Sequence, residues 1–156
     1  MTTNLILAGL YNAVLVGTCV YAFVRGGRPE RIGAAVCLLA SYGTVVIRII
    51  WPSQWLPASA LVLAVDVAVL AIFFWLATST IRFWPIWASG FMLGNVAVTI
   101  AGAMFPQVHL FSFHTGLGAY AYLVLGAIGL GTYRLGSRPD PIVRNGSRRL
   151  WLQGQR

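Results

Sequence analysis

Residues 58–79 read ASALVLAVDVAVLAIFFWLATS, an apolar stretch interrupted by one charged side chain, Asp66. A helix that crosses the hydrocarbon core of a bilayer needs about 20 mainly apolar residues, and this stretch is long enough. It therefore predicts a membrane-spanning helix with a single acid inside it. A charge at that depth costs about 2.5–3.5 kcal/mol on insertion scales, so we expect Asp66 to be paired, protonated or in contact with a wet cavity.

Four further stretches have the same character, and they cover residues 4–24, 32–50, 83–105 and 115–133. The seven prolines all fall outside the interiors of these stretches, as expected for residues that break helices. The chain is 58% hydrophobic and only 9% charged, whereas a soluble domain is about 25% charged. This composition excludes an ordinary soluble fold and intrinsic disorder. We expect an all-α membrane protein, with a bundle of five transmembrane helices over residues 1–133 and a basic tail over 134–156.

The distribution of arginines predicts the orientation of the bundle. Of the 11 basic residues, all but Arg48 lie in the first turn, in the third turn or in the tail. By the positive-inside rule these segments face the cytoplasm, so the N-terminus lies outside, in the periplasm, and the C-terminus inside. Trp51 and Trp55 would mark the outer interface, and Trp84 and Trp87 the inner one, unless they are simply packed core residues.

The localisation predicted in this way is the inner membrane of a bacterium, as a multi-pass protein. The net charge of +8 indicates an anionic membrane surface rather than nucleic acid as the partner, because the basic residues adjoin apolar stretches. The arginines expected to contact lipid headgroups or an acidic partner are Arg25, Arg28, Arg31, Arg144, Arg148 and Arg149.

Small residues recur along single faces of three predicted spans, and close van der Waals contact drives helix association in lipid. They are Gly9, Ala13 and Gly17 in the first span, Gly90, Gly94 and Gly102 in the fourth, and Gly118 and Gly126 in the fifth. We expect these faces to pack within the chain; packing against a neighbouring protein is the alternative.

Polar residues occur at similar depths in the outer half of the bundle. They are Asp66, Arg48, Asn12, Thr44, Asn95, Thr99 and Tyr120. Arg48 is the predicted partner of Asp66, with its side chain reaching inward from a shallower position. The cluster is either an ion pair with hydrogen bonds that fixes helix packing, or a site for a small ligand or a proton that opens toward the periplasm.

His109 and His114 are the only histidines, and histidine can ligate haem or a pigment metal. Their spacing does not place them on one helix face, so interfacial polar residues are the simpler interpretation. The sequence requires no cofactor and has no metal-binding pattern.

Three segments together resemble a group of small alphaproteobacterial membrane proteins with no assigned activity. They are the turn at residues 25–31, the surroundings of Asp66, and residues 82–91, which read RFWPIWASGF. The resemblance implies an inner-membrane location and transfers no catalytic residue to this chain.

The sequence contains no catalytic motif, and its only acids are Glu30, Asp66 and Asp140, too few for most paired-carboxylate mechanisms. Our first hypothesis is a non-enzymatic subunit, accessory or assembly component of a larger respiratory or photosynthetic membrane complex, which acts through contacts with other integral membrane subunits. The alternative is a small-ligand or proton-handling protein with a periplasm-facing pocket at Asp66 and Arg48. A weaker alternative is pigment or haem binding through His109 or His114.

Overall fold

The computed structural model describes residues 2–50, 56–104, 110–135 and 141–153, with side chains over 6–50, 60–102, 119–135, 141–148 and 151–153. The long elements are the helices α1 (Thr2–Arg25), α2 (Arg28–Ile50), α3 (Leu56–Ser79), α4 (Trp84–Met104) and α5 (Leu110–Arg134). Two short helices follow, α6 (Pro141–Asn145) and α7 (Arg148–Gln153). Over the described residues this confirms the expected all-helical architecture.

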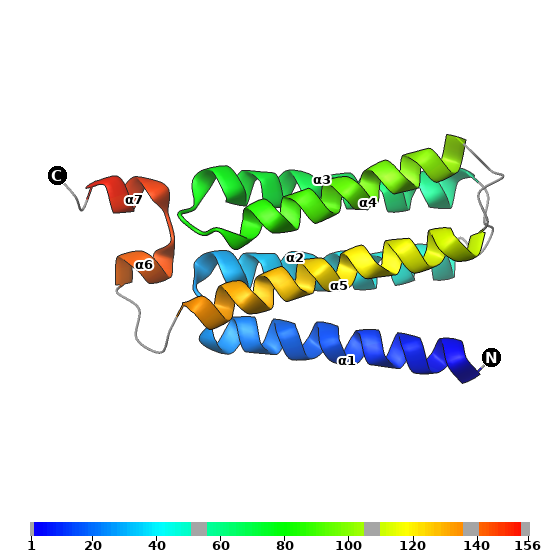
Figure 1. The fold of residues 1–156 in the computed structure, drawn as a ribbon, viewed down its shortest axis with the longest axis horizontal. Helices are drawn as coiled ribbons and strands as arrows, with labels where there is room; N and C mark the ends of the chain where they lie inside the picture. The colour runs from blue at the N-terminus through cyan, green and yellow to red at the C-terminus, as the bar shows by residue number, and fades with distance from the viewer. Residues whose placement is uncertain (1, 51–55, 105–109, 136–140, 154–156) are drawn as a thin grey trace.

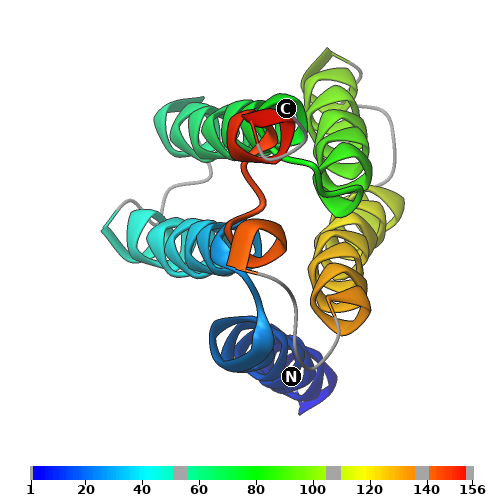
Figure 2. The same cartoon turned by 90° about the vertical axis from the view of Figure 1, so that its left-hand side faces the viewer.

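The five long helices run alongside one another, and each reverses the direction of the one before it (Figure 1). Seen end-on they form a ring in chain order, closed by contact between α1 and α5, and α2 also touches α5 across the ring (Figure 2). We call the end that carries α6 and α7 the tail end. The N-terminus lies at the opposite end, called the far end here (Figure 1).

Among the residues that the structure describes, four segments are long and apolar enough to cross a membrane: Ile6–Arg25, Arg28–Ile50, Ala60–Ser79 and Trp84–Gly102. Large apolar side chains cover the outside of the bundle; Leu39 is 75% exposed and Ile49 is 72% exposed. Such a surface is suited to lipid and not to water. The chain therefore has the helices of a multi-pass membrane protein.

Prolines lie in the first turn of four helices. Pro29, Pro57 and Pro85 are the second residues of α2, α3 and α4, and Pro141 is the first residue of α6. A first-turn residue has no carbonyl partner for its N–H within the helix, so proline loses nothing there. This explains why α2 begins at Arg28, ahead of the expected start at residue 32.

The buried core is concentrated in the half of the bundle next to the tail end. Phe73, Leu76 and Ile128 are almost completely buried there, and the Trp84 ring packs edge-on against Phe73. The Trp84 ring also lies against Gly33 of α2 and Gly131 of α5, where any side chain would overlap it. Trp84 is therefore a packed core residue and not an interface marker, whereas Trp87 is 52% exposed.

Candidate functional site

A cavity of about 300 Å³ lies among the five long helices, and Asp66 is part of its wall. We call it the Asp66 cavity. Its polar lining residues are Tyr11 of α1, Ser41, Thr44 and Arg48 of α2, Asp66 of α3 and Asn95 of α4. Apolar side chains, among them Val124 and Leu125 of α5, complete the wall. The cavity thus combines one carboxylate, one guanidinium and several neutral polar groups.

Asp66 lies near the middle of α3 and is half-buried, facing Asn95 on α4. The Asn95 side-chain amide donates a hydrogen bond to Asp66 Oδ2 over 3.0 Å. Asn95 itself is only 8% exposed, so the amide is held in place by the packing of α3 against α4. A carboxylate has about four lone-pair sites, and one hydrogen bond leaves most of them available.

Arg48 lines the same cavity, but the described residues contain no ion pair between Arg48 and Asp66. The predicted pairing is therefore wrong. Arg48 is in the last turn of α2, whereas Asp66 is about ten residues into α3 from the same end. At 1.5 Å per residue their backbones differ in depth by roughly 12 Å, and the Arg48 side chain remains exposed.

A second hydrogen bond across the cavity joins Tyr11 and Ser41, whose side-chain oxygens are 3.0 Å apart. Sequence reasoning selected the neighbouring Asn12 instead, and that selection is wrong because Asn12 is exposed on the outside of α1. A step of one residue turns a helix by about 100°, which is enough to move a side chain from the interior to the surface. The sequence did contain a signal for this position, because the Tyr11 side chain combines an apolar ring with a polar hydroxyl group.

The other predicted members of the polar cluster make local contacts. Thr44 lines the cavity, and its hydroxyl donates to the Ala40 carbonyl over 2.8 Å. Thr99 donates to the Asn95 carbonyl over 2.9 Å and does not line the cavity. The Tyr120 ring packs against Gly94 on α4, also away from the cavity.

Most of the predicted small-residue faces make no close contact with other helices within the described part of the chain. A Cβ added at Gly9, Gly17, Gly90 or Gly126 would meet nothing within 4 Å, and Ala13 is exposed. Gly94 does bring a helix close, since a Cβ there would come within 2.9 Å of the Tyr120 ring. The expectation of packing within the chain therefore holds at Gly94 and fails at Gly9, Gly17, Gly90 and Gly126. Gly118 lies outside the residues with described side chains. No contact is described for Gly102. The first-span face, formed by Gly9, Ala13 and Gly17, points away from the described side chains of the other helices.

Sequence reasoning missed a network centred on Glu30, which is completely buried at the tail end. Glu30 Oε1 accepts a hydrogen bond from Trp84 Nε1 over 3.0 Å and lies 3.3 Å from Arg82 Nε. Glu30 Oε2 accepts from the Gly27 backbone N–H over 3.0 Å. This last bond is one half of a capping box. In that motif, a glutamate at the third position of a helix accepts a hydrogen bond from the backbone N–H of the residue that precedes the helix. The sequence Gly27-Arg28-Pro29-Glu30 carries that signal.

The same network holds the tail. Arg82 Nη2 donates to the Val143 carbonyl over 2.7 Å, and the Ile81 backbone N–H donates to the Gly146 carbonyl over 3.0 Å. Gly146 has a φ of +67° and packs on Pro29, so glycine is needed there for both conformation and space. The tail is therefore docked on the bundle, and its contacts are with the turns that precede α2 and α4.

The predicted lipid-facing arginines remain exposed where the structure describes them. Arg25, Arg28, Arg31, Arg144 and Arg148 are exposed at the tail end, and the side chain of Arg149 lies outside the described residues. His109 also lies outside them, and His114 lies in α5 at a position whose side chain is not described. Within the described residues no group of three or more His, Cys, Asp or Glu side chains could hold a metal ion.

In comparisons with known proteins, no family model, no curated protein and no solved structure matches this chain.

Proposed function

We propose that this chain is a five-span protein of the bacterial inner membrane that binds a small zwitterionic molecule in the Asp66 cavity. The observation that carries the proposal is that Asp66 and Arg48 line one cavity without neutralising each other. A guest with one cationic and one anionic group would satisfy both charges. A half-buried charge such as Asp66 is costly without a partner, so a guest whose cationic group pairs with Asp66 is favoured over a neutral one, and its anionic group can pair with the exposed Arg48.

The size of the cavity supports a small guest. Ligand pockets in proteins range over about 300–1,000 Å³, and the Asp66 cavity is at the lower limit. The Asn95 amide orients the carboxylate, and the Tyr11–Ser41 pair adds hydroxyl groups on the facing wall. Because no catalytic motif accompanies these groups, binding or passage of the guest is the proposed activity, without chemical conversion.

The topology proposed is five crossings, with the tail end in the cytoplasm. Its support is the length of α5, which has 25 residues, whereas a helix of about 20 residues is long enough to cross a bilayer. The exposed arginines at the tail end outnumber the single arginine near the far end, as the positive-inside rule requires of a cytoplasmic side. An odd number of crossings then leaves the N-terminus in the periplasm.

The test uses small zwitterions, namely amino acids and betaines, as probes with the purified full chain in mild detergent. At ten times the dissociation constant, a bound probe is expected to raise the unfolding temperature by roughly 3–6 °C. It should also slow the labelling of Cys37, which lines the cavity, by a small thiol reagent. Buried Cys19, which does not line the cavity, serves as the internal control.

Asp66→Asn and Arg48→Gln should each abolish both effects, and Arg31→Gln, at an exposed position outside the cavity, should leave them unchanged. The proposal fails if no zwitterion stabilises the protein, or if the Asp66→Asn variant responds to probes as the unmodified chain does.

A second candidate function is that of an accessory subunit in a larger membrane complex. The observation that favours it is the face of α1 formed by Gly9, Ala13 and Gly17, which has no close neighbour among the described residues. Small residues at four-residue spacing allow a second helix to approach closely in lipid. Stoichiometric partners after extraction in mild detergent, lost on Gly17→Leu substitution, would support this function; an isolated monomer would count against it.

A further inference from the structure

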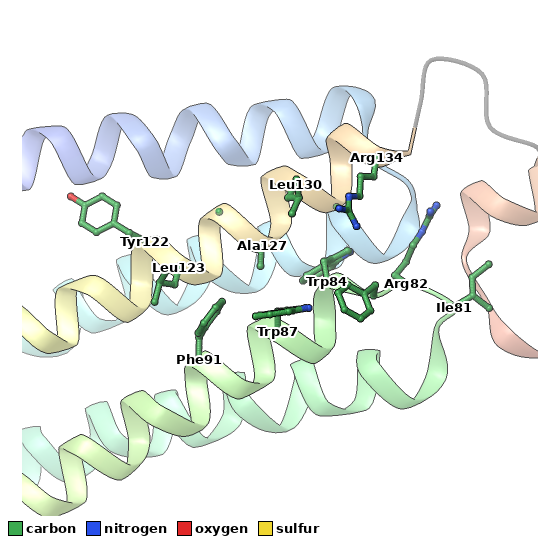
Figure 3. Close-up of a pocket in the computed structure, with 13 residues that line it drawn as sticks. Ile81, Arg82, Trp84, Trp87, Phe91, Tyr122, Leu123, Ala127, Leu130 and Arg134 are labelled. Carbon is green, nitrogen blue, oxygen red and sulfur yellow. The ribbon is translucent and has the colours of Figure 1, made fainter.

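A second cavity, which shares no lining residue with the Asp66 cavity, lies in a groove between α4 and α5 near the tail end. Its volume is about 540 Å³. Trp87 and Phe91 project into it from α4, and Tyr122 and Leu130 line it from α5 (Figure 3). Trp87 and Leu130 are each about half exposed, so the groove opens on the outside of the bundle, where lipid surrounds a membrane protein.

The charged lining of the groove is confined to one end. Arg82 and Arg134 lie at the end nearest the tail, and the aromatic side chains extend away from them toward Tyr122 (Figure 3). Arg82 already contacts Glu30 and the Val143 carbonyl. Arg134 is exposed, and within the described part of the chain no carboxylate forms an ion pair with it. The groove is therefore amphipathic, with a cation at its mouth and an apolar channel beyond.

The length of the groove matches one leaflet of a bilayer. Tyr122 and Arg134 are separated by 12 residues of α5, or about 18 Å along the helix axis. Half of a hydrocarbon core about 30 Å thick is about 15 Å. With Arg134 at the depth of the headgroups, the aromatic part of the groove runs through the hydrocarbon of the same leaflet.

We propose that the α4–α5 groove binds one anionic membrane lipid of the leaflet at the tail end. The lipid phosphate pairs with the Arg134 guanidinium, and one acyl chain lies along Trp87 and Phe91 toward Tyr122. Gly126 makes room for the chain, because it lines the groove and no atom lies within 4 Å of where its Cβ would be. The exposed Arg134 guanidinium at the headgroup end favours an anionic lipid over an apolar protein helix as the occupant. This site is independent of the Asp66 cavity.

The experiment is a lipid titration of the purified full chain in mild detergent, followed by native mass spectrometry. The two probes are phosphatidylglycerol and phosphatidylcholine with identical acyl chains. One arginine beside an anionic headgroup is expected to give the unmodified chain a roughly fivefold preference for phosphatidylglycerol.

Two variants separate the headgroup from the chain. Arg134→Gln should remove the preference while retaining binding of both lipids. Gly126→Leu should fill the groove and lower the occupancy of both lipids several-fold. Gly43→Leu is the matched control, since a Cβ at Gly43 would also meet nothing within 4 Å, and Gly43 lies on α2, outside the groove.

Neither test variant removes a contact in the core, so unfolding temperatures close to that of the unmodified chain are expected. The proposal is overturned if Arg134→Gln keeps the preference or if Gly126→Leu binds lipid as Gly43→Leu does. It is also overturned if the unmodified chain is a dimer that Gly126→Leu converts to monomers, because a second copy would then occupy the groove.

Discussion

Glu30 and Asp66 are both carboxylates within apolar helices, yet their surroundings differ. Glu30 is completely buried and has three partners, namely the Gly27 N–H, the Trp84 indole N–H and the Arg82 guanidinium. Asp66 is half-buried, and the one hydrogen bond described for its carboxylate comes from Asn95. A buried charge is tolerated only when its lone pairs are satisfied, and Glu30 meets that condition.

The difference separates a structural acid from one that is available for binding. The Glu30 partners come from the turns that precede α2 and α4, and Arg82 extends the network to the tail. The surroundings follow the same division, since Glu30 contacts the buried Trp84 indole, whereas Asp66 lines a cavity. The tail-end network therefore links α2, α4 and the tail, whereas most lone pairs of Asp66 are used by no described contact.

The largest effect is expected from Glu30→Ala. Removing one partner of a buried ion pair costs about 3–5 kcal/mol, because Arg82 and the Trp84 indole lose their acceptor together. The measurement is the free energy of unfolding in mixed detergent and denaturing micelles. Arg28→Ala, at an exposed position in the same turn, is the control and should change that free energy by less than about 0.5 kcal/mol. If Glu30→Ala lowers the free energy of unfolding no more than Asp66→Ala does, the two acids do not differ in their structural role.

The hydrophobic lengths and prolines of the sequence were sufficient to predict the helices, because in lipid the backbone must satisfy its own hydrogen bonds and only a helix does so within one segment. Rotation about each helix axis was not predictable in the same way. In a bundle surrounded by lipid both faces of a helix are apolar, so the pattern that marks the inward face of a soluble helix is weak. This is why Asn12 was placed inside and Tyr11 was missed.

Contacts between residues that are far apart in the sequence were the second feature that the sequence did not predict. Asp66 and Asn95 were both selected because polar residues stand out in apolar helices, but their direct hydrogen bond depends on how α3 packs on α4. Glu30 was overlooked because it lies among arginines in a turn, where an exposed charge is the ordinary expectation. Its burial results from the approach of Trp84 and of the tail, which no local pattern encodes.

An intermediate effect is expected where a glycine makes room for the Trp84 ring. Gly131→Leu places a side chain where the ring lies, and overpacking of this kind costs about 1–3 kcal/mol. Gly126→Leu, on the same helix but in open space, should be close to neutral in the same unfolding assay. Near-ultraviolet circular dichroism of the tryptophans would report whether Trp84 has moved. Equal stability of the two variants would show that the ring is not held between α2 and α5.

The smallest effect is expected from Asn95→Ala. Hydrogen bonds between membrane helices contribute on average about 0.6 kcal/mol, so removing the Asn95 amide should lower the free energy of unfolding by roughly that amount. If Asp66 serves binding, this variant should nevertheless weaken zwitterion binding clearly, because the carboxylate loses the group that orients it. Thr99→Ala, whose hydroxyl bonds only to its own helix, is the control for both measurements. A stability loss for Asn95→Ala as large as that of Glu30→Ala would make Asp66 a structural acid as well, since its one described hydrogen bond would then be holding α3 to α4.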